Sequence, residues 1–187
     1  MASQLCLVLG GVRSGKSAFA EGKVAGFSQS TLYVATGVAF DEEMKDRIQK
    51  HQELRPSAWA TLEEPIKLAE KLSPLLEEPD GPGAVIIDSI DVWVANVLME
   101  HETEDKETQG KIMINQADEL LNLVASSRQD FVVVSSEVGL SLVSPDPLGR
   151  RFQDLLGTVN QRIAAAATEV FLVVAGIPTR IKPAGTE

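Results

Sequence analysis

Short continuous apolar runs, separated by stretches of helical character, set the pattern of this sequence. Each run has four to five residues, is rich in Val, Ile and Leu, and does not alternate with polar residues. Strands that are buried on both faces of a parallel sheet have this pattern. The runs are 5–9, 32–35, 84–87, 131–134 and 170–174, and the helical stretches are 16–26, 41–53, 65–76, 90–100, 108–127 and 148–167. This alternation predicts an α/β fold in which helices flank a mostly parallel central sheet.

The length and composition favour one domain in a reducing compartment. A chain of 187 residues is long enough for one hydrophobic core, so we expect a single domain over residues 1–187. No apolar run approaches the roughly 18–20 residues of a membrane span, and the first run lacks the basic flank of a signal peptide. The single cysteine, Cys6, lies inside that run, as expected for a buried strand residue. A cytoplasmic location is the expectation.

A glycine-rich segment directly follows the first apolar run. Residues 10–17, with the sequence GGVRSGKS, fit the pattern G-x-x-x-x-G-K-[ST] and precede a stretch of helical character. In such a phosphate loop, backbone N–H groups and the helix N-terminus bind the phosphates of a nucleotide. Lys16 would reach the β and γ phosphate oxygens, and the Ser17 hydroxyl would bind Mg²⁺. The alternative, a glycine turn beside a surface lysine, does not account for the strand before it and the helix after it.

A carboxylate at the end of the third apolar run offers a second ligand for Mg²⁺. Asp88 follows four apolar residues, at the point where a strand would emerge from the sheet. Phosphate-loop proteins take a magnesium ligand from an acid in this position. The alternative role for Asp88 is the N-cap of the following helix.

The net charge of −10 constrains the partners of the protein. It argues against nucleic acid and anionic membranes, which attract basic surfaces. It also means that a triphosphate must be bound by local features, namely backbone N–H groups, a few cationic side chains and a metal ion.

A histidine lies between two arginines in the second helical stretch. At helical spacing, Arg47, His51 and Arg55 share one face, four residues apart. A neutral imidazole can attack phosphorus and form a phosphoramidate, while arginines hold the phosphates. The alternative is a partly exposed surface histidine.

Several segments, in one order along the chain, carry a resemblance to a known family. The loop 10–17 matches the restrictive form G-G-x-R-S-G-K-S, and residues 41–56 match D-x-E-M-x-x-R-I-x-x-H-x-x-x-R-P. Further matches are 33–36 (YVAT), Asp88 with Trp93 and Asn96, 136–139 (SEVG), 150–157 (RRFQDLLG) and 160–162 (NQR). The chain thereby resembles the bifunctional adenosylcobinamide kinase/adenosylcobinamide-phosphate guanylyltransferase family of cobalamin biosynthesis, over nearly its whole length.

The resemblance implies a RecA-like P-loop fold, a homotrimer and two reactions. First, the γ-phosphate of GTP or ATP is transferred to adenosylcobinamide; then GMP from GTP is placed on adenosylcobinamide phosphate through a guanylylated histidine, which gives adenosylcobinamide-GDP. His51 matches that histidine. The implied catalytic residues are His51 and Lys16, and the implied metal ligands are Ser17 and Asp88. The implied nucleotide-binding positions are Gly10, Gly11, Val12, Arg13, Ser14, Gly15, Lys16, Ser17, Ala35, Thr36, Gly37, Gln52, Glu53, Leu54, Arg55, Glu63 and Asp88.

The chain departs from the family pattern at a few positions. Residues 89–91 (SID) stand where a less polar Cys-Leu-Thr-like run is common, Ser136 where Asn is frequent, and Lys50 where some members have a second histidine. None lies in the phosphate loop. Two other functions fit the residues: a monofunctional P-loop small-molecule kinase, in which His51 only contacts phosphate, and a non-catalytic GTP-sensing module.

Overall fold

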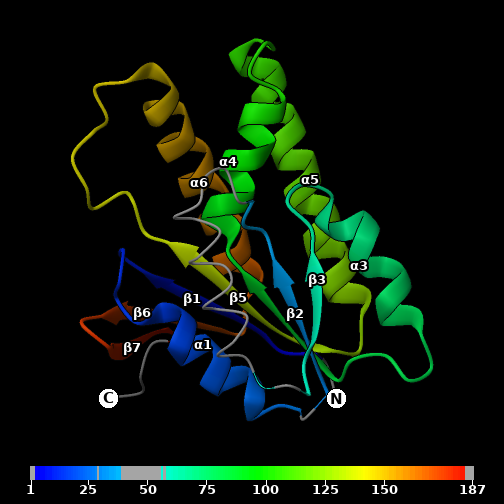
Figure 1. Cartoon of the computed structure of the whole chain (residues 1–187). Coiled ribbons are helices and arrows are strands. Elements are labelled where there is room, and N and C mark those ends of the chain that lie inside the picture. Colours follow the sequence, from blue (N-terminus) through cyan, green and yellow to red (C-terminus); the bar gives the residue numbers. More distant parts are fainter. Residues whose placement is uncertain (1–2, 29, 39–55, 57, 184–187) are drawn as a thin grey trace.

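The computed structural model describes residues 3–28, 30–38, 56 and 58–183. Its centre is a seven-stranded sheet in the order β3-β2-β4-β5-β1-β6-β7 (Figure 1). Every pair in this sheet is parallel except β6 with β7. The strands are β1 (Leu5–Gly10), β2 (Thr31–Ala35), β3 (Ala60–Glu63), β4 (Ala84–Asp88), β5 (Asp130–Ser136), β6 (Glu169–Val174) and β7 (Ile177–Lys182). The predicted α/β class is confirmed, and the arrangement is consistent with a RecA-like P-loop fold.

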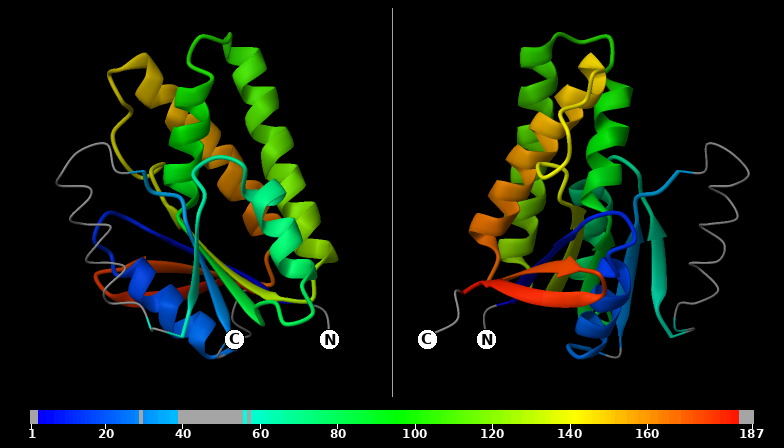
Figure 2. Two further views of the ribbon diagram at one scale, coloured as in Figure 1. Left: turned by 45° about the vertical axis from the view of Figure 1, so that its right-hand side comes forward. Right: turned by 90° about the vertical axis from the view of Figure 1, so that its left-hand side faces the viewer.

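Helices cover both faces of the sheet, as Figures 1 and 2 show. On one face lies α1 (Lys16–Ala25), and on the other lie α3 (Leu68–Glu77), α4 (Ile90–Glu100), α5 (Lys106–Ser126) and α6 (Pro147–Ala166). Strand side chains alternate between the two layers, so that Leu7 packs with α3–α6 and Cys6 packs with α1. All six residues of β1 are buried, which explains its continuous apolar sequence.

Most element boundaries agree with those expected from the sequence, and the shifts have local causes. The helix predicted from residue 108 begins at Lys106 because Asp105 caps it, accepting hydrogen bonds from the N–H groups of Glu107 and Thr108. Asp146 likewise caps α6 and sets its start at Pro147. The helix expected over 41–53 lies outside the described residues. None of the helices in the described ranges has the length and apolar character needed to cross a membrane.

Two edge strands were not expected from the sequence. Three of the four residues of β3 are exposed, and β7 has the mixed sequence IPTRIK, so neither contains an apolar run. Ala175 and Gly176, with φ of 51° and 82°, form a two-residue turn between β6 and β7. The sequence feature that could have predicted this hairpin is a glycine in a two-residue gap between stretches rich in β-branched residues.

The phosphate loop connects β1 to α1 and packs against this turn. The N–H of Gly176 donates to the carbonyl of Ser14 over 2.8 Å. Gly15 has φ of 93°, a left-handed conformation that favours glycine. At Gly10, an added β-carbon would overlap the Ser14 hydroxyl and lie 2.8 Å from the carbonyl oxygen of Val173. The start of the loop is therefore confined between the Ser14 side chain and β6.

Gly10→Ala is expected to displace the phosphate loop, because the carbonyl of Val173 belongs to the sheet and cannot move freely. The free energy of unfolding should fall by about 1–3 kcal/mol, as for other overpacked sites, and triphosphate affinity should fall with it. Gly22→Ala is the matched control, since an added β-carbon there meets nothing within 4 Å and alanine favours a helix. Denaturant unfolding and nucleotide titration measure both effects; wild-type values for Gly10→Ala would contradict the model of a confined loop.

The thiol of Cys6 is expected not to react with thiol reagents in the folded protein. It is fully buried in β1, and burial raises the pKa of its thiol from 9.0 to about 12. Since only the thiolate reacts, the reactive fraction at pH 8 is about a thousandfold lower than with a pKa of 9.0. Labelling with an aromatic disulfide reagent should therefore follow the unfolding transition in denaturant. Rapid stoichiometric labelling without denaturant would contradict this expectation.

Candidate active site

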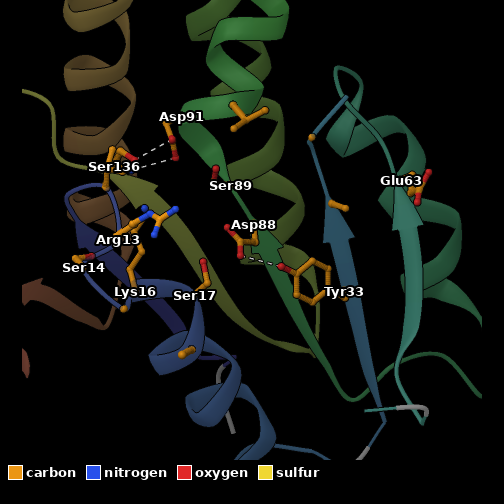
Figure 3. Close-up of a pocket in the computed structure, with 16 residues that line it drawn as sticks. Arg13, Ser14, Lys16, Ser17, Tyr33, Glu63, Asp88, Ser89, Asp91 and Ser136 are labelled. Carbon is orange, nitrogen blue, oxygen red and sulfur yellow. Dashed lines mark hydrogen bonds between the residues drawn. The ribbon is translucent and has the colours of Figure 1, made fainter. Parts of the chain in front are cut away.

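The strands β3, β2, β4, β5 and β1 are parallel, so their carboxyl ends meet at one edge of the sheet. A cavity of about 520 Å³ lies at this edge, and Figure 3 shows the residues around it. Ligands of open α/β sheets bind in this position. Ten residues predicted from the sequence line it: Val12, Arg13, Ser14, Gly15, Lys16, Ser17, Ala35, Gly37, Glu63 and Asp88.

The phosphate loop forms one wall of the cavity. Helix α1 starts at Lys16, and no side chain caps its N-terminus at Gly15. Its first N–H groups are thus available to an anion, and the helix dipole favours negative charge there. The Lys16 ammonium donates to the carbonyl of Gly11 over 3.4 Å, a long bond that a phosphate oxygen can replace. Arg13, within the loop, is exposed. The loop has the features of a triphosphate site.

Gly10, Gly11 and Thr36 are predicted nucleotide-binding residues that do not line the cavity. Thr36 is fully buried. Its hydroxyl donates to the carbonyl of Ser89 over 2.8 Å and accepts from the N–H of Ser89 over 2.9 Å. Asn96 donates to the carbonyl of Thr36 over 2.8 Å. In this structure, Thr36 therefore fixes the junction between β4 and α4, next to the cavity.

Ser17 and Asp88 face the same cavity from α1 and from the end of β4 (Figure 3). The N-cap of α4 is Ser89, so Asp88 is not the cap. One oxygen of the Asp88 carboxylate accepts a hydrogen bond from the hydroxyl of Tyr33 over 2.8 Å. This bond orients the carboxylate and leaves further lone pairs for a ligand.

The donor set at this point of the cavity fits Mg²⁺. Ser17 and Asp88 provide one hydroxyl and one carboxylate, and Mg²⁺ takes oxygen ligands, often only one or two from protein. Among the described residues, no cluster of three or more His, Cys, Asp or Glu side chains could hold a metal by itself. Phosphate oxygens and water would therefore have to complete the coordination.

Sequence reasoning assigned no role to some of the lining residues: Ala18, Tyr33, Ser89, Asp91, Val92 and Ser136. The Asp91 carboxylate accepts from the N–H of Ser136 over 3.1 Å and from its hydroxyl over 2.8 Å. These are two of the positions at which the chain departs from the family pattern. Their positions in the sequence could have pointed to a role in the site, since Ser136 ends β5 and Asp91 follows the end of β4 by three residues.

The charged side chains do not make the described part of the cavity positive. The lining includes two cationic side chains, Arg13 and Lys16, and three acidic ones: Glu63, Asp88 and Asp91. Since a triphosphate carries several negative charges, backbone N–H groups and cations from outside this set must contribute.

The predicted nucleophile and its neighbours lie outside the described residues. They are Arg47, His51, Gln52, Glu53, Leu54 and Arg55. The described residues on either side of this segment are close to the cavity. Gly37 lines it, and the Trp59 ring stacks on that of Tyr33 with 6.5 Å between centroids.

Comparisons with known proteins place the chain in a family. The model of the family described as cobinamide kinase / cobinamide phosphate guanyltransferase matches residues 6–181. The chain is 39% identical to a bifunctional adenosylcobalamin biosynthesis protein CobU from Salmonella typhimurium, over 95% of this chain and 99% of the relative. It is 37% identical to the protein of the same name from Escherichia coli, with the same coverage. A bifunctional adenosylcobalamin biosynthesis protein CobP from Pseudomonas aeruginosa is 34% identical over 94% of this chain and 96% of its own length. With the phosphate loop in place and matches along almost its whole length, the chain belongs to the cobinamide kinase/cobinamide phosphate guanyltransferase family.

Proposed function

We propose that this protein phosphorylates adenosylcobinamide and then transfers GMP from GTP to the adenosylcobinamide phosphate, through a guanylylated His51. This proposal rests mainly on the cavity at the strand ends, in which the phosphate loop, including Ser17, faces Asp88. The family model and the names of the three relatives support both activities. GTP and ATP are the proposed nucleotides, and residues 1–187 are the proposed single catalytic domain.

In the kinase reaction, the phosphate loop holds the β-phosphate and Lys16 contacts the β and γ oxygens. The acceptor hydroxyl attacks the γ-phosphorus in line with the bridging oxygen, and the nucleoside diphosphate leaves. Mg²⁺ bound by Ser17 and Asp88 would neutralise charge on the phosphates. The role of the protein is mainly to position the reactants and to stabilise charge.

In the guanylyl reaction, the attack is on the α-phosphorus, and pyrophosphate leaves. The His51 imidazole forms the N–P bond, and a phosphate oxygen of the acceptor then displaces histidine. Arg47 and Arg55, which share a helical face with His51 in the predicted helix, would bind the phosphates. The positions of Gly37 and Trp59 support this assignment, because Gly37 lines the cavity and Trp59 stacks on Tyr33, another lining residue.

The remaining assignments follow from position. Val12, Arg13, Ser14 and Gly15 bind phosphate with the rest of the loop, and Gly10 and Gly11 shape it. Ala35, Gly37 and Glu63 line the part of the cavity away from the loop, where the nucleoside would lie. Gln52, Glu53, Leu54 and Arg55 complete the proposed nucleotide site, and Thr36 positions it. We further propose a cytoplasmic homotrimer.

His51→Ala should abolish formation of a covalent GMP adduct while part of the kinase activity remains. The wild-type protein, incubated with α-labelled GTP and Mg²⁺ and then denatured, should carry a label that is lost in acid and kept in base. His101→Ala is the matched control, because His101 follows α4 at the end remote from the cavity (Figure 1). An unlabelled wild-type protein that still phosphorylates the acceptor would indicate a monofunctional kinase. A protein that binds GTP without turnover of any corrinoid would indicate a sensing module.

Lys16→Ala should weaken triphosphate binding and reduce both reactions, by roughly a hundredfold or more in kcat/KM if one charge-assisted contact in the transition state is lost. Lys111→Ala removes an exposed lysine that pairs with Glu107 on α5 and serves as the control. Steady-state kinetics of each reaction measure the effect. Unchanged kinetics of the Lys16 variant would exclude the proposed phosphate site.

Asp88→Asn should raise the Mg²⁺ concentration for half-maximal kinase activity by about tenfold or more, because an amide oxygen is a weaker ligand than a carboxylate. Asp80→Asn, in the exposed turn before β4, removes a charge without touching the cavity. Titration of activity with Mg²⁺ separates the two variants. If Asp88→Asn and Asp80→Asn showed the same Mg²⁺ dependence, Asp88 would not be a metal ligand.

A further inference from the structure

We propose that Asp91 is a catalytic residue of the kinase reaction, where its carboxylate accepts the hydrogen bond and then the proton of the acceptor hydroxyl. This inference rests on the proposed function and names the group that faces the second substrate. The carrying observation is a rigidly held carboxylate in the cavity wall, close to the phosphate loop and separate from the proposed metal ligands.

Asp91 is held by a hydrogen-bond network that crosses three elements. Its two carboxylate oxygens accept from the N–H and the hydroxyl of Ser136, at 3.1 Å and 2.8 Å. The carbonyl of Ser136 accepts from the side-chain amide of Asn160 over 3.0 Å, and that amide's oxygen accepts from Ser135 over 2.7 Å. Ser136 and Asn160 are only 8% and 6% exposed. The carboxylate on α4 is therefore fixed by β5 and, behind it, by α6.

The hydrogen-bond network leaves lone pairs of the Asp91 carboxylate free to bind a ligand. Asp91 is half-buried at the cavity wall, and a carboxylate has about four lone-pair sites, two of which are used here. Its carboxylate makes no ion pair with another described residue. A carboxylate that is oriented by hydrogen bonds but makes no ion pair with a described residue can accept a further hydrogen bond, for example from a hydroxyl group of a ligand.

The sheet order places this carboxylate at the phosphate end of the cavity. Asp91 bonds to the end of β5, the strand next to β1 and the phosphate loop. Glu63 ends β3, at the far edge of the sheet beyond β2 and β4. In Figure 3, Asp91 and Ser136 lie above Arg13, and Glu63 lies on the opposite side beyond Tyr33. Of the acids lining the described cavity, Asp91 is therefore placed for the acceptor near the γ-phosphate, and Asp88 for the metal.

The proposed step is balanced within the reaction. The acceptor oxygen forms a bond to the γ-phosphorus as the bond between that phosphorus and the β–γ bridging oxygen breaks. The electron pair of the broken bond stays on the nucleoside diphosphate. The hydroxyl proton passes to Asp91 and then to solvent, which the half-buried side chain can reach.

A purely structural role for Asp91 makes a different prediction. An acid in the first turn of α4 stabilises the helix through its dipole, and its bonds to Ser136 join α4 to β5. Loss of that role alone would lower stability and would impair both reactions together. The GMP transfer to preformed adenosylcobinamide phosphate needs no hydroxyl proton to be removed, so the two reactions separate these explanations.

The test compares Asp91→Asn with wild type in both reactions, with Asp80→Asn as the control. Phosphorylation of adenosylcobinamide, followed with γ-labelled nucleotide, should lose about a hundredfold or more in kcat, within the range for general base catalysis. The KM for the nucleotide and the rate of GMP transfer to preformed adenosylcobinamide phosphate should stay within about threefold of wild type. Equal losses in both reactions, or a kinase rate close to wild type, would overturn the proposal. Recovery of the kinase rate at high Mg²⁺ would also overturn it, since Asp91 would then act through the metal.

Ser136→Ala provides a second variant that keeps the carboxylate. It removes the hydroxyl donor but keeps the backbone N–H, so the kinase kcat should fall by about fivefold to tenfold, the loss expected for one hydrogen bond, with GMP transfer again preserved. If Asp91→Asn does not fold, judged by its melting curve, this variant decides the question. Loss in neither reaction, or equal loss in both, would reject the role of Asp91. If wild type shows neither activity with these acceptors, the proposed function itself fails.

Discussion

The parallel pairing of β1 with β5, and of β5 with β4, determines how the parts of the site are spaced. Because β5 lies between the other two, Gly10 and Asp88 end strands that are two spacings apart, and each spacing is about 4.8 Å. A phosphate chain with a hydrated cation can fill such a gap. The intervening strand also brings Ser136 between the loop and the acid. The proposed binding of phosphate and metal, and the position of Asp91, thus all depend on one strand order.

The acidity of the chain shapes the chemistry of this site. A protein with a net charge of −10 repels nucleotides at long range, and the described cavity adds three acids to two cationic side chains. Affinity must therefore come from short-range contacts, namely N–H groups at the start of α1 and the proposed Mg²⁺. Two of the acids already accept hydrogen bonds from neutral hydroxyl groups, those of Tyr33 and Ser136. These bonds orient the carboxylates without neutralising them, which leaves their charge for a metal or a proton.

The sequence allowed the prediction of the parts of the fold that depend on burial and backbone conformation. The five apolar runs became strands because both faces of a parallel sheet exclude water, and residues 10–17 form a loop because glycine favours the left-handed conformation at Gly15. The edge strands β3 and β7 escaped prediction because exposed edges select polar residues. Within the site, Lys16 and Asp88 were predictable from local motifs. The pairing of Asp91 with Ser136 was not, because 45 residues separate them and only the strand order brings them together. Thr36 is predicted to contact nucleotide, and the structure adds that its hydroxyl bonds to Ser89, a contact that depends on the register of β2 with β4.

The contact between the phosphate loop and the β6–β7 turn has a consequence for how the molecule is made. Residue 14 receives its hydrogen bond from residue 176, and β1 is paired on one side with β5 and on the other with β6. During synthesis, the first strand therefore lacks its sheet neighbours until about two thirds of the chain exists, and Ser14 lacks its bond to Gly176 until the last hairpin emerges. Contacts of such long sequence separation slow folding. The part of the protein that is translated first thus receives some of its supporting contacts from the part that is translated last.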